Sequence, residues 1–248
     1  MSLEDYRTAL VTGASSGVGA ATARALRKRG LAVHVVARRR DRLELLAKEI
    51  GAEAHALDLR DTAAVHRVLG ALEIDVLVNN AGMGLGYEGG FLTLAPEEID
   101  AQIETNLSAA LHVTRALAPG MAARRRGHIV NVSSISALYP IQFATYAAGK
   151  GGLHLFTQNL RIELKGAGVR VTEVAPGRIK TGFFDKAMPD DAQREAFLSG
   201  FEILRPEDVS NAILYALDAP WRVNVGLIEL TPTEQTVGGM TVTPVRPA

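Results

Sequence analysis

Residues 8–30 read "TALVTGASSGVGAATARALRKRG", and this stretch decides the fold. Its first part, 8–12, is a short apolar run that contains β-branched residues, which predicts a strand. The segment 18–29 has the hydrophobic period of a helix, and Gly30 follows it as a C′ glycine follows a helix. A strand that turns directly into a helix is the first half of a βαβ unit.

The turn between this strand and this helix contains three glycines, Gly13, Gly17 and Gly19. One glycine permits a sharp turn, another lets a pyrophosphate approach the backbone, and the last allows the helix to pack closely on the strand. The helix N-terminus adds free N–H donors and the positive end of its dipole. A turn without a ligand is the alternative. The expected dinucleotide contacts here are Gly13, Ser15, Ser16, Gly17, Val18 and Gly19.

The alternation of strand and helix continues along the chain. Further strands are expected at 31–37, 52–57, 74–79, 127–134, 168–176 and 223–230, and further helices at 41–50, 62–71, 96–122, 145–165 and 206–218. Several of these strands are apolar nearly throughout, as in strands that are covered on both faces. The order predicts an α/β protein with a single-domain Rossmann fold, in which helices cover both faces of a doubly wound parallel sheet of about seven strands.

One domain is expected to span 1–248, because no linker, internal repeat or low-complexity tract interrupts the pattern. The longest stretch without a clear strand is 177–205, which predicts a short helical insertion that forms a lid over the site. The tail, 231–248, is rich in Thr, Pro and Gly and is expected to be loose or packed on a partner.

The composition argues against several classes of protein. Lys plus Arg and Asp plus Glu balance at 27 each, so neither nucleic acid nor an anionic membrane is an expected partner. The chain has no cysteine, which excludes disulfides and thiolate nucleophiles. Its six histidines show no H-x-x-x-H or carboxylate-paired spacing, so no metal site is expected. The first residues do not resemble a secretory signal and no apolar run is long enough to span a bilayer, which predicts a cytoplasmic protein.

Residues 146–150 read "YAAGK", which places Tyr146 and Lys150 on the same face of a helix. A free tyrosine has a pKa of about 10 and is a poor acid–base group at neutral pH. A nearby ammonium stabilises the phenolate and lowers that pKa. The small residues between the two would let a cofactor lie close. The pair therefore indicates a group that can donate and accept a proton.

The glycine turn in the form T-G-x-x-x-G-x-G, "NNAG" (79–82) and Y-x-x-x-K together resemble the short-chain dehydrogenase/reductase family over nearly the whole chain. The resemblance implies an oxidoreductase that acts on CH–OH groups. It also implies a catalytic set that consists of Asn106, Ser134, Tyr146 and Lys150. Tyr146 would supply the proton, Ser134 would bind the substrate oxygen, and Lys150 would hold the cofactor ribose. Asn106 would support a proton relay through Lys150.

The residues after the second strand select the dinucleotide. An acidic residue at the strand end would bind the ribose hydroxyls of NAD, but the chain has Ala37 there, followed by Arg38, Arg39 and Arg40. A guanidinium binds a 2′-phosphate through paired, charge-assisted hydrogen bonds, so NADP(H) is the expected cofactor. Arg38 is the first candidate for this contact and Arg39 the second. The alternative is a solvated arginine loop before a helix.

The resemblance places further cofactor contacts along the chain. They fall on Asp58 and Leu59 at the adenine, on Asn80, Ala81 and Gly82 in the cleft, and on Pro176, Gly177, Ile179 and Thr181 around the nicotinamide. Asn79 and Asn80 would brace the central sheet. Arg178 and Lys180 lie in the nicotinamide loop and are expected to be exposed to solvent; contact with an acidic substrate or a phosphate is the alternative.

The C-terminal part is similar to one branch of the family, the NADP-dependent 3-hydroxy acid (serine-type) dehydrogenases and sulfoacetaldehyde-type reductases. The branch implies a small carbonyl or alcohol substrate and a homotetramer or homodimer. Phe183 and Phe184 stand where some members have a basic residue, which favours a more apolar or aromatic pocket. The candidate substrate contacts are Ser134, Ser136, Tyr139, Phe143 and Phe183.

Two other functions stay open at this point. One is a 3-oxoacyl carrier-protein reductase, which would need a basic surface beside the cleft for its acidic carrier. The other is a non-catalytic NADP-binding sensor or scaffold on the same fold. Such proteins typically lack the tyrosine or the lysine, whereas this chain has both Tyr146 and Lys150.

Overall fold

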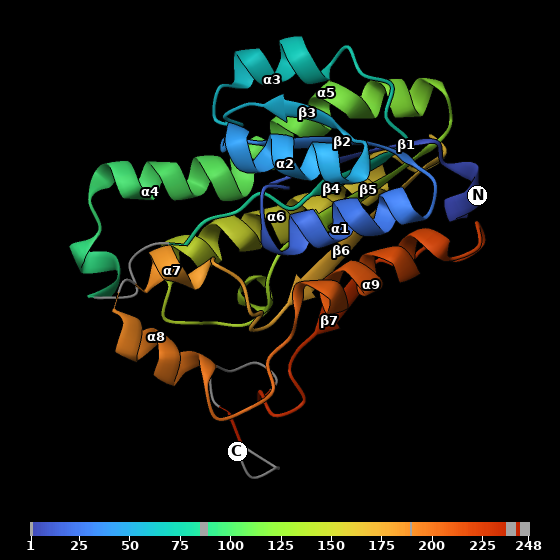
Figure 1. The fold of residues 1–248 in the computed structure, drawn as a ribbon. Coiled ribbons are helices and arrows are strands. Elements are labelled where there is room, and N and C mark those ends of the chain that lie inside the picture. The colour runs from blue at the N-terminus through green and yellow to red at the C-terminus, as the bar shows by residue number, and fades with distance from the viewer. Residues whose placement is uncertain (1, 85–88, 189, 237–241, 244–248) are drawn as a thin grey trace.

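The computed structural model describes residues 2–84, 89–188, 190–236 and 242–243, so much of the expected tail 231–248 lies outside the described residues. Seven strands of the described chain form one parallel sheet in the order β3-β2-β1-β4-β5-β6-β7. This confirms the expected doubly wound sheet (Figure 1). The strands are β1 (Thr8–Thr12), β2 (Ala32–Ala37), β3 (Glu53–Ala56), β4 (Val76–Asn79), β5 (Gly127–Val132), β6 (Val169–Pro176) and β7 (Leu227–Leu230).

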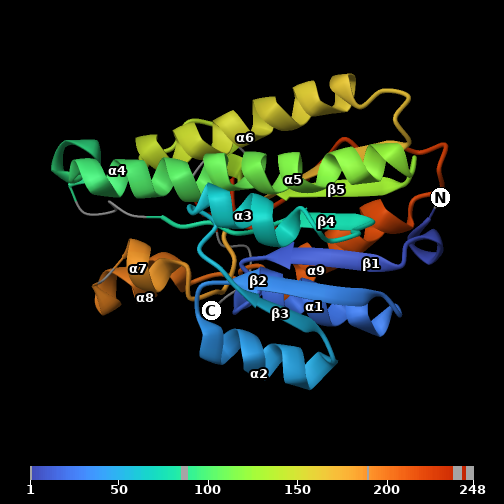
Figure 2. The ribbon, with the colours of Figure 1, turned by 90° about the horizontal axis from the view of Figure 1, so that it is seen from above.

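Helices cover both faces of this sheet, as Figure 2 shows. The faces follow from the alternation of side chains along a strand. In β1, Ala9 and Val11 join one apolar core and Leu10 joins the other, and all three are fully buried. The first core is covered by α1 (Gly17–Lys28), α2 (Arg40–Ile50) and α9 (Pro206–Asp218), and the second by α3 (Thr62–Leu69), α5 (Ala109–Ala123) and α6 (Ala144–Glu163).

The order of the strands determines where a ligand can bind. The chain runs outward from β1 to β2 and β3, and then crosses β1 to form β4 on its other side. In open parallel sheets of this kind, ligands bind beyond the carboxyl ends of the strands at the point where the order reverses. Here that point lies between β1 and β4, next to the glycine turn.

The long helix expected at 96–122 is interrupted. The structure has α4 (Pro96–Ile103), a π-helical turn η3 (Glu104–Ser108) and then α5. Asn106, a poor helix former, lies in this π turn and is buried. Single π turns inside α-helices occur frequently at functional sites. A hydrophobic period alone does not reveal one extra residue in a turn, which explains why the interruption was missed.

The segment expected to form a lid contains two short helices, α7 (Phe184–Ala187) and α8 (Asp191–Leu198). They share a small apolar cluster with a core of Phe184, Ala187 and Met188. Figure 2 places both helices beyond the end of the sheet that is opposite the N-terminus. The short elements η1 (Leu3–Asp5), η2 (Gly90–Thr93) and η4 (Ile135–Ala137) complete the described fold. No helix within the described ranges combines the length and the apolarity needed to cross a membrane.

Candidate active site

A cleft of about 810 Å³ lies at the carboxyl ends of the strands and is bordered by the segment around α7 and α8. Most of the site residues expected from the sequence line it. These are Gly13, Ser15, Ser16, Gly17, Val18, Arg38, Arg39, Asp58, Leu59, Asn80, Ala81, Gly82, Ser134, Phe143, Tyr146, Lys150, Pro176, Gly177, Ile179, Thr181 and Phe183. Four expected residues, Gly19, Asn106, Ser136 and Tyr139, are not part of the lining.

The glycine turn is packed too closely for a side chain at two of its glycines. Gly13 has a φ of +66°, and a Cβ on it would lie 2.9 Å from the Cα of Ala81. Gly17 also has a positive φ, +54°, which L-residues rarely adopt. A Cβ on Gly19 would lie 2.6 Å from the carbonyl oxygen of Gly13. Gly19 therefore serves the close packing of α1 on the turn and does not line the cleft.

Four arginines line one end of the cleft: Arg38, Arg39, Arg42 and Arg60. Arg39 reaches across to the glycine turn, where its Nη2 donates to the Oγ atoms of Ser16 at 2.7 Å and Ser15 at 2.9 Å. These contacts place a guanidinium directly beside the helix N-terminus, and both groups favour an anion. Arg42 and Arg60 were missed, because they lie outside the motif that carries Arg38 and Arg39.

Asp58 lies at the same end of the cleft and forms a paired contact with Arg60. The Nη2 of Arg60 donates to the Oδ2 of Asp58 at 2.7 Å. Hydrogen bonds from the Arg60 side chain hold the pKa of the Asp58 carboxyl below its ordinary value. Asp58 is therefore an anion at neutral pH whose charge is offset by Arg60.

The "NNAG" segment joins the central strands. The Nδ2 of Asn79 donates to the Oδ1 of Asn131 at 2.8 Å and to the Oγ1 of Thr114 at 2.9 Å, so it links β4, β5 and α5. The Nδ2 of Asn80 donates to the carbonyl oxygen of Thr12 at 2.9 Å and holds the segment against the end of β1. Asn79 is buried and braces the sheet, whereas Asn80 lines the cleft.

The cleft brings Ser134, Tyr146 and Lys150 together. Tyr146 and Lys150 lie on α6, and the hydroxyl of Tyr146 forms a hydrogen bond with Ser134. Ser134 precedes η4, and its Oγ accepts from the backbone N–H of Ser136 at 3.2 Å. The ammonium of Lys150 donates to the carbonyl oxygen of Val132 at 2.9 Å. A phenol and a hydroxyl, both partly exposed, thus share one corner of the cleft with a buried ammonium.

The pKa values in this corner are controlled by burial. Burial raises the pKa of Tyr146 to about 12, and the hydrogen bond with Ser134 acts in the opposite direction. Burial also lowers the pKa of Lys150 to about 8, while the charge of Glu173 raises it. The expected lowering of the Tyr146 pKa by Lys150 is therefore not seen: burial has the largest effect on this pKa, and the opposing effect comes from Ser134. In this protein a neutral phenol is the stable form at neutral pH.

Asn106 lies behind the cleft wall. Its amide is held by the backbone of Met83: Oδ1 accepts from the N–H at 3.0 Å and Nδ2 donates to the carbonyl oxygen at 2.7 Å. A Cβ on Gly82 would lie 3.1 Å from the Oδ1 of Asn106 and 3.4 Å from the Nζ of Lys150. Asn106 and Lys150 therefore meet behind Gly82, although Asn106 does not line the cleft.

A buried carboxylate that the sequence analysis did not single out lies on the other side of Lys150. Glu173, on β6, is fully buried. It accepts a short hydrogen bond from the Oγ of Ser133, and its Oε2 lies 2.7 Å from the Nδ1 of His154. His154 follows Lys150 by four residues, which places both on one face of α6. That spacing was the available signal for this network.

Two expected substrate contacts lie elsewhere. Ser136 is buried within η4 and is not part of the cleft lining. The hydroxyl of Tyr139 donates to the Oε2 of Glu229 at 3.0 Å, in an exposed contact with β7. The turn η4 follows Ser134 directly, so Ser136 and Tyr139 lie outside the cleft although they are close to Ser134 in sequence.

The expectation that Arg178 is exposed to solvent is wrong, whereas Lys180 is exposed. The Arg178 side chain is 8% exposed, and its guanidinium carbon lies 3.8 Å from the ring centroid of Phe197. Its backbone N–H donates to the Oε1 of Gln235 at 3.1 Å. Phe197 and Gln235 also line the cleft, and both were missed. They are remote in sequence from the motif that contains Arg178, so no local pattern connects them.

Comparison with known proteins agrees with this geometry. A family model described as short chain dehydrogenase matches residues 7–192. The NADP-dependent 3-hydroxy acid dehydrogenase YdfG of Escherichia coli (strain K12) is 35% identical over 94% of this chain and 98% of its own. Serine 3-dehydrogenase of Agrobacterium fabrum is 35% identical, and the match covers 95% of this chain and 97% of that protein.

A solved structure, the closed form of serine dehydrogenase complexed with NADP+, is also similar. It has a TM-score of 0.89 and 35% identity, and the match covers 95% of this chain and 99% of that one. The chain belongs to the short-chain dehydrogenase family.

Proposed function

We propose that this protein is an NADP(H)-dependent oxidoreductase that interconverts a secondary alcohol or a 3-hydroxy acid with its carbonyl compound. The observation that carries the proposal is the convergence of Ser134, Tyr146 and Lys150 in the cleft that the glycine turn also lines. The named relatives use NADP or act on serine or 3-hydroxy acids, which supports the same reaction class.

The residues of the cleft fit NADP(H). Gly13 and Gly17 line the cleft and carry no side chain, so a pyrophosphate could approach the backbone of the turn closely. Arg38 and Arg39 would hold the 2′-phosphate, and Asp58 with Leu59 would border the adenine. Pro176, Gly177, Ile179 and Thr181 would surround the nicotinamide.

The chemistry that NADP(H) supplies when bound is hydride transfer to or from the carbonyl carbon. In the reducing direction, the Oη of Tyr146 donates its proton to the substrate oxygen. The Oγ of Ser134 donates a hydrogen bond to the same oxygen and polarises the carbonyl group. The ammonium of Lys150 stabilises the phenolate that Tyr146 becomes. Asn106, which the Met83 backbone holds, supports a relay through Lys150 that returns a proton from solvent to Tyr146.

The segment 177–205 serves as the substrate lid in this proposal. The ring centroid of Phe183 lies 5.6 Å from that of Tyr146, and Phe143 lines the same cleft. These aromatic rings favour a substrate with an apolar body next to its carbonyl group. The proposal places the protein in the cytoplasm and gives it a homotetrameric or homodimeric assembly, in line with the family resemblance.

A screen of NADPH consumption tests the proposal. The purified protein would be offered 3-keto acids, aldehydes, aryl ketones and diketones, each with NADPH and with NADH. We expect turnover with NADPH for at least one of these carbonyl classes, and far weaker turnover with NADH. Tight NADPH binding without oxidation over the whole panel would replace the enzyme proposal with a non-catalytic NADP-binding role.

Replacing Phe183 by alanine is expected to change substrate choice. The Phe183 ring lies between Tyr146 and Gly84, where a Cβ on Gly84 would approach it to 2.6 Å. Removing the ring opens space beside the proton donor, so kcat/KM for bulky aryl ketones relative to small keto acids should rise roughly tenfold. Phe91→Ala is the control, because Phe91 is 57% exposed and outside the lining. The same ratio in Phe183→Ala and the parent protein would rule out this role.

Glu173→Gln is expected to move the alkaline limb of the pH profile. The Glu173 charge raises the pKa of Lys150, which stands at about 8. Without that charge the pKa falls further, so Lys150 loses its proton at lower pH and stops stabilising the phenolate. We expect the limb of kcat/KM for carbonyl reduction to shift down by about one pH unit. Glu229→Gln, at an exposed carboxylate, should leave the profile unchanged; an equal shift in both variants would contradict the role of Glu173.

A further inference from the structure

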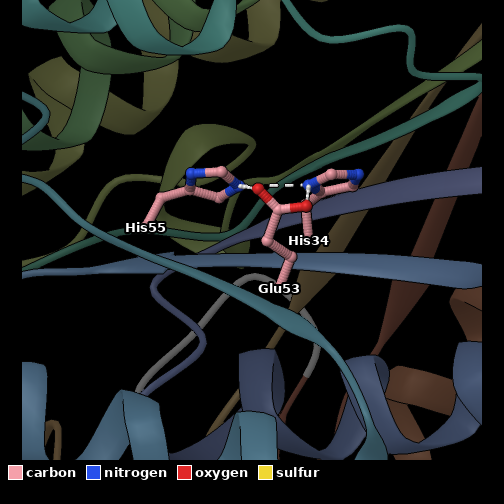
Figure 3. A group of neighbouring side chains, drawn as sticks. All are labelled: His34, Glu53 and His55. Carbon is pink, nitrogen blue, oxygen red and sulfur yellow. Dashed lines mark hydrogen bonds and ion pairs between the residues drawn. The ribbon is translucent and has the colours of Figure 1, made fainter.

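Three side chains outside the cleft form a group whose composition suits a metal ion. They are His34 on β2 and Glu53 and His55 on β3. Figure 3 shows the Glu53 carboxylate directed at the facing nitrogens of the two imidazole rings. None of the three residues lines the cleft. The sequence argument that the histidines lack a carboxylate-paired spacing is therefore wrong, because Glu53 and His55 are two residues apart on one strand.

The pairing of β2 with β3 creates this group. His34 is the register partner of Glu53, and Val36 is the partner of His55. Residues two apart on a strand point to the same face, so all three side chains lie on the face opposite Val33 and Val35. That face is the one away from α1 and α2. The group is thus held by two paired strands and does not depend on a loop.

The distances within the group match those between ligands of one small cation. The Nδ1 of His34 lies 3.0 Å from the Nε2 of His55. The Oε2 of Glu53 lies 3.6 Å from the Nδ1 of His34, and its Oε1 lies 3.5 Å from the Nε2 of His55. A zinc ion at about 2.0–2.2 Å from its ligands in tetrahedral geometry separates them by about 3.4 Å. One ion could therefore reach all three side chains with small rotations.

The surroundings also favour binding. The side chains of His34 and His55 are 15% and 11% exposed, while that of Glu53 is 64% exposed. The exposed carboxylate leaves a path for the ion and a position for water.

We infer that His34, Glu53 and His55 bind one divalent transition-metal ion of the zinc type, with water completing the coordination. Two imidazoles and a carboxylate are ligands that such ions accept. The ion would tie β3, the edge strand, to β2. These strands lead directly into Arg38 and Asp58, at one end of the cleft. The role inferred for the ion is to stabilise this edge of the sheet, and it is independent of the proposed reaction.

A second pair of histidines provides a control. The Nε2 of His66 lies 3.1 Å from the Nδ1 of His112, nearly the same separation as in the first pair. Within the described part of the chain, however, no carboxylate or further histidine joins His66 and His112 in such a group. Two ligands without a third bind a metal far more weakly, so this pair controls for adventitious binding by imidazoles.

The experiment uses the full-length protein without an affinity tag, stripped with a chelator and titrated with Zn²⁺ by calorimetry. We expect one equivalent to bind and Tm to rise on addition of Zn²⁺. His34→Ala and His55→Ala should each weaken binding by more than about a hundredfold, since loss of a residue that only supports a ligand already costs about ten- to a hundredfold. Glu53→Gln, at an exposed side chain, should weaken binding without affecting the fold.

The outcomes separate the two histidine pairs. Unchanged one-to-one binding in the His66→Ala/His112→Ala double variant, together with its loss in His55→Ala, would support the site. Replacement of Zn²⁺ by Co²⁺ should then give visible absorption bands that disappear in His55→Ala. No binding to the parent protein, or equal binding by His34→Ala, His55→Ala and the parent, would overturn the inference. A Tm measured in chelator reports whether each variant is folded.

Discussion

Tyr146→Phe is expected to lower kcat for carbonyl reduction by about 10²- to 10⁴-fold, the range that a positioned proton donor contributes. The substitution removes only the hydroxyl, which forms a hydrogen bond with Ser134. The ring would keep its contact with Phe183, 5.6 Å away between centroids. The measurement is steady-state NADPH consumption with the best substrate from the carbonyl screen.

The control for this variant is cofactor binding. Because the phenyl ring still fills the same space, the Kd for NADPH should stay within a few-fold of the parent value. Near-normal turnover in Tyr146→Phe would show that another group donates the proton. Lost NADPH binding would instead point to a collapsed cleft, which a thermal unfolding measurement would reveal.

Arg38→Asp is expected to raise the Kd for NADPH by about a hundredfold and to change the Kd for NADH little. One hydrogen bond to a charged group contributes about 1.5–3 kcal/mol, and each 1.4 kcal/mol is a tenfold change in Kd. The new carboxylate would also repel the 2′-phosphate. The measurement is fluorescence titration of both cofactors against the parent protein.

Two neighbouring arginines make this test sharper. Arg39→Asp removes the bonds to Ser15 and Ser16 in the glycine turn as well as a phosphate contact, so it should weaken NADH too, and NADPH further. Arg40 is outside the cleft lining and lies 3.4 Å from Glu44, so Arg40→Asp should change neither Kd. An equal loss of NADPH and NADH affinity in Arg38→Asp would contradict the phosphate role of Arg38.

The sheet and the glycine turn could be predicted because their signals are local. The apolar strands, the helical periods and Gly13 in its turn are each encoded within about a dozen neighbouring residues. The i, i+4 spacing of Tyr146 and Lys150 is local in the same sense, and the resemblance to the family supplied Ser134. The structure places Gly13, Ser134, Tyr146 and Lys150 in the lining of one cleft.

The remaining features depend on contacts between distant segments. The burial of Arg178 arises from Phe197 and Gln235, which no motif connects to it. The group of His34, Glu53 and His55 exists only through the register of β2 and β3. The raised pKa of Tyr146 comes from burial by the folded chain, whereas the sequence analysis considered only the neighbouring ammonium. Such properties require the tertiary structure.

The most direct test of the central claim is isotope transfer from NADPH that carries deuterium in both positions at C4 of its nicotinamide ring. The product alcohol would be analysed by mass spectrometry after incubation with the parent protein and with Tyr146→Phe. We predict that the parent protein places deuterium on the carbinol carbon, and that Tyr146→Phe forms this labelled alcohol at a rate lower by at least about a hundredfold. Unlabelled alcohol from the parent protein, or equal rates in the two proteins, would contradict the account.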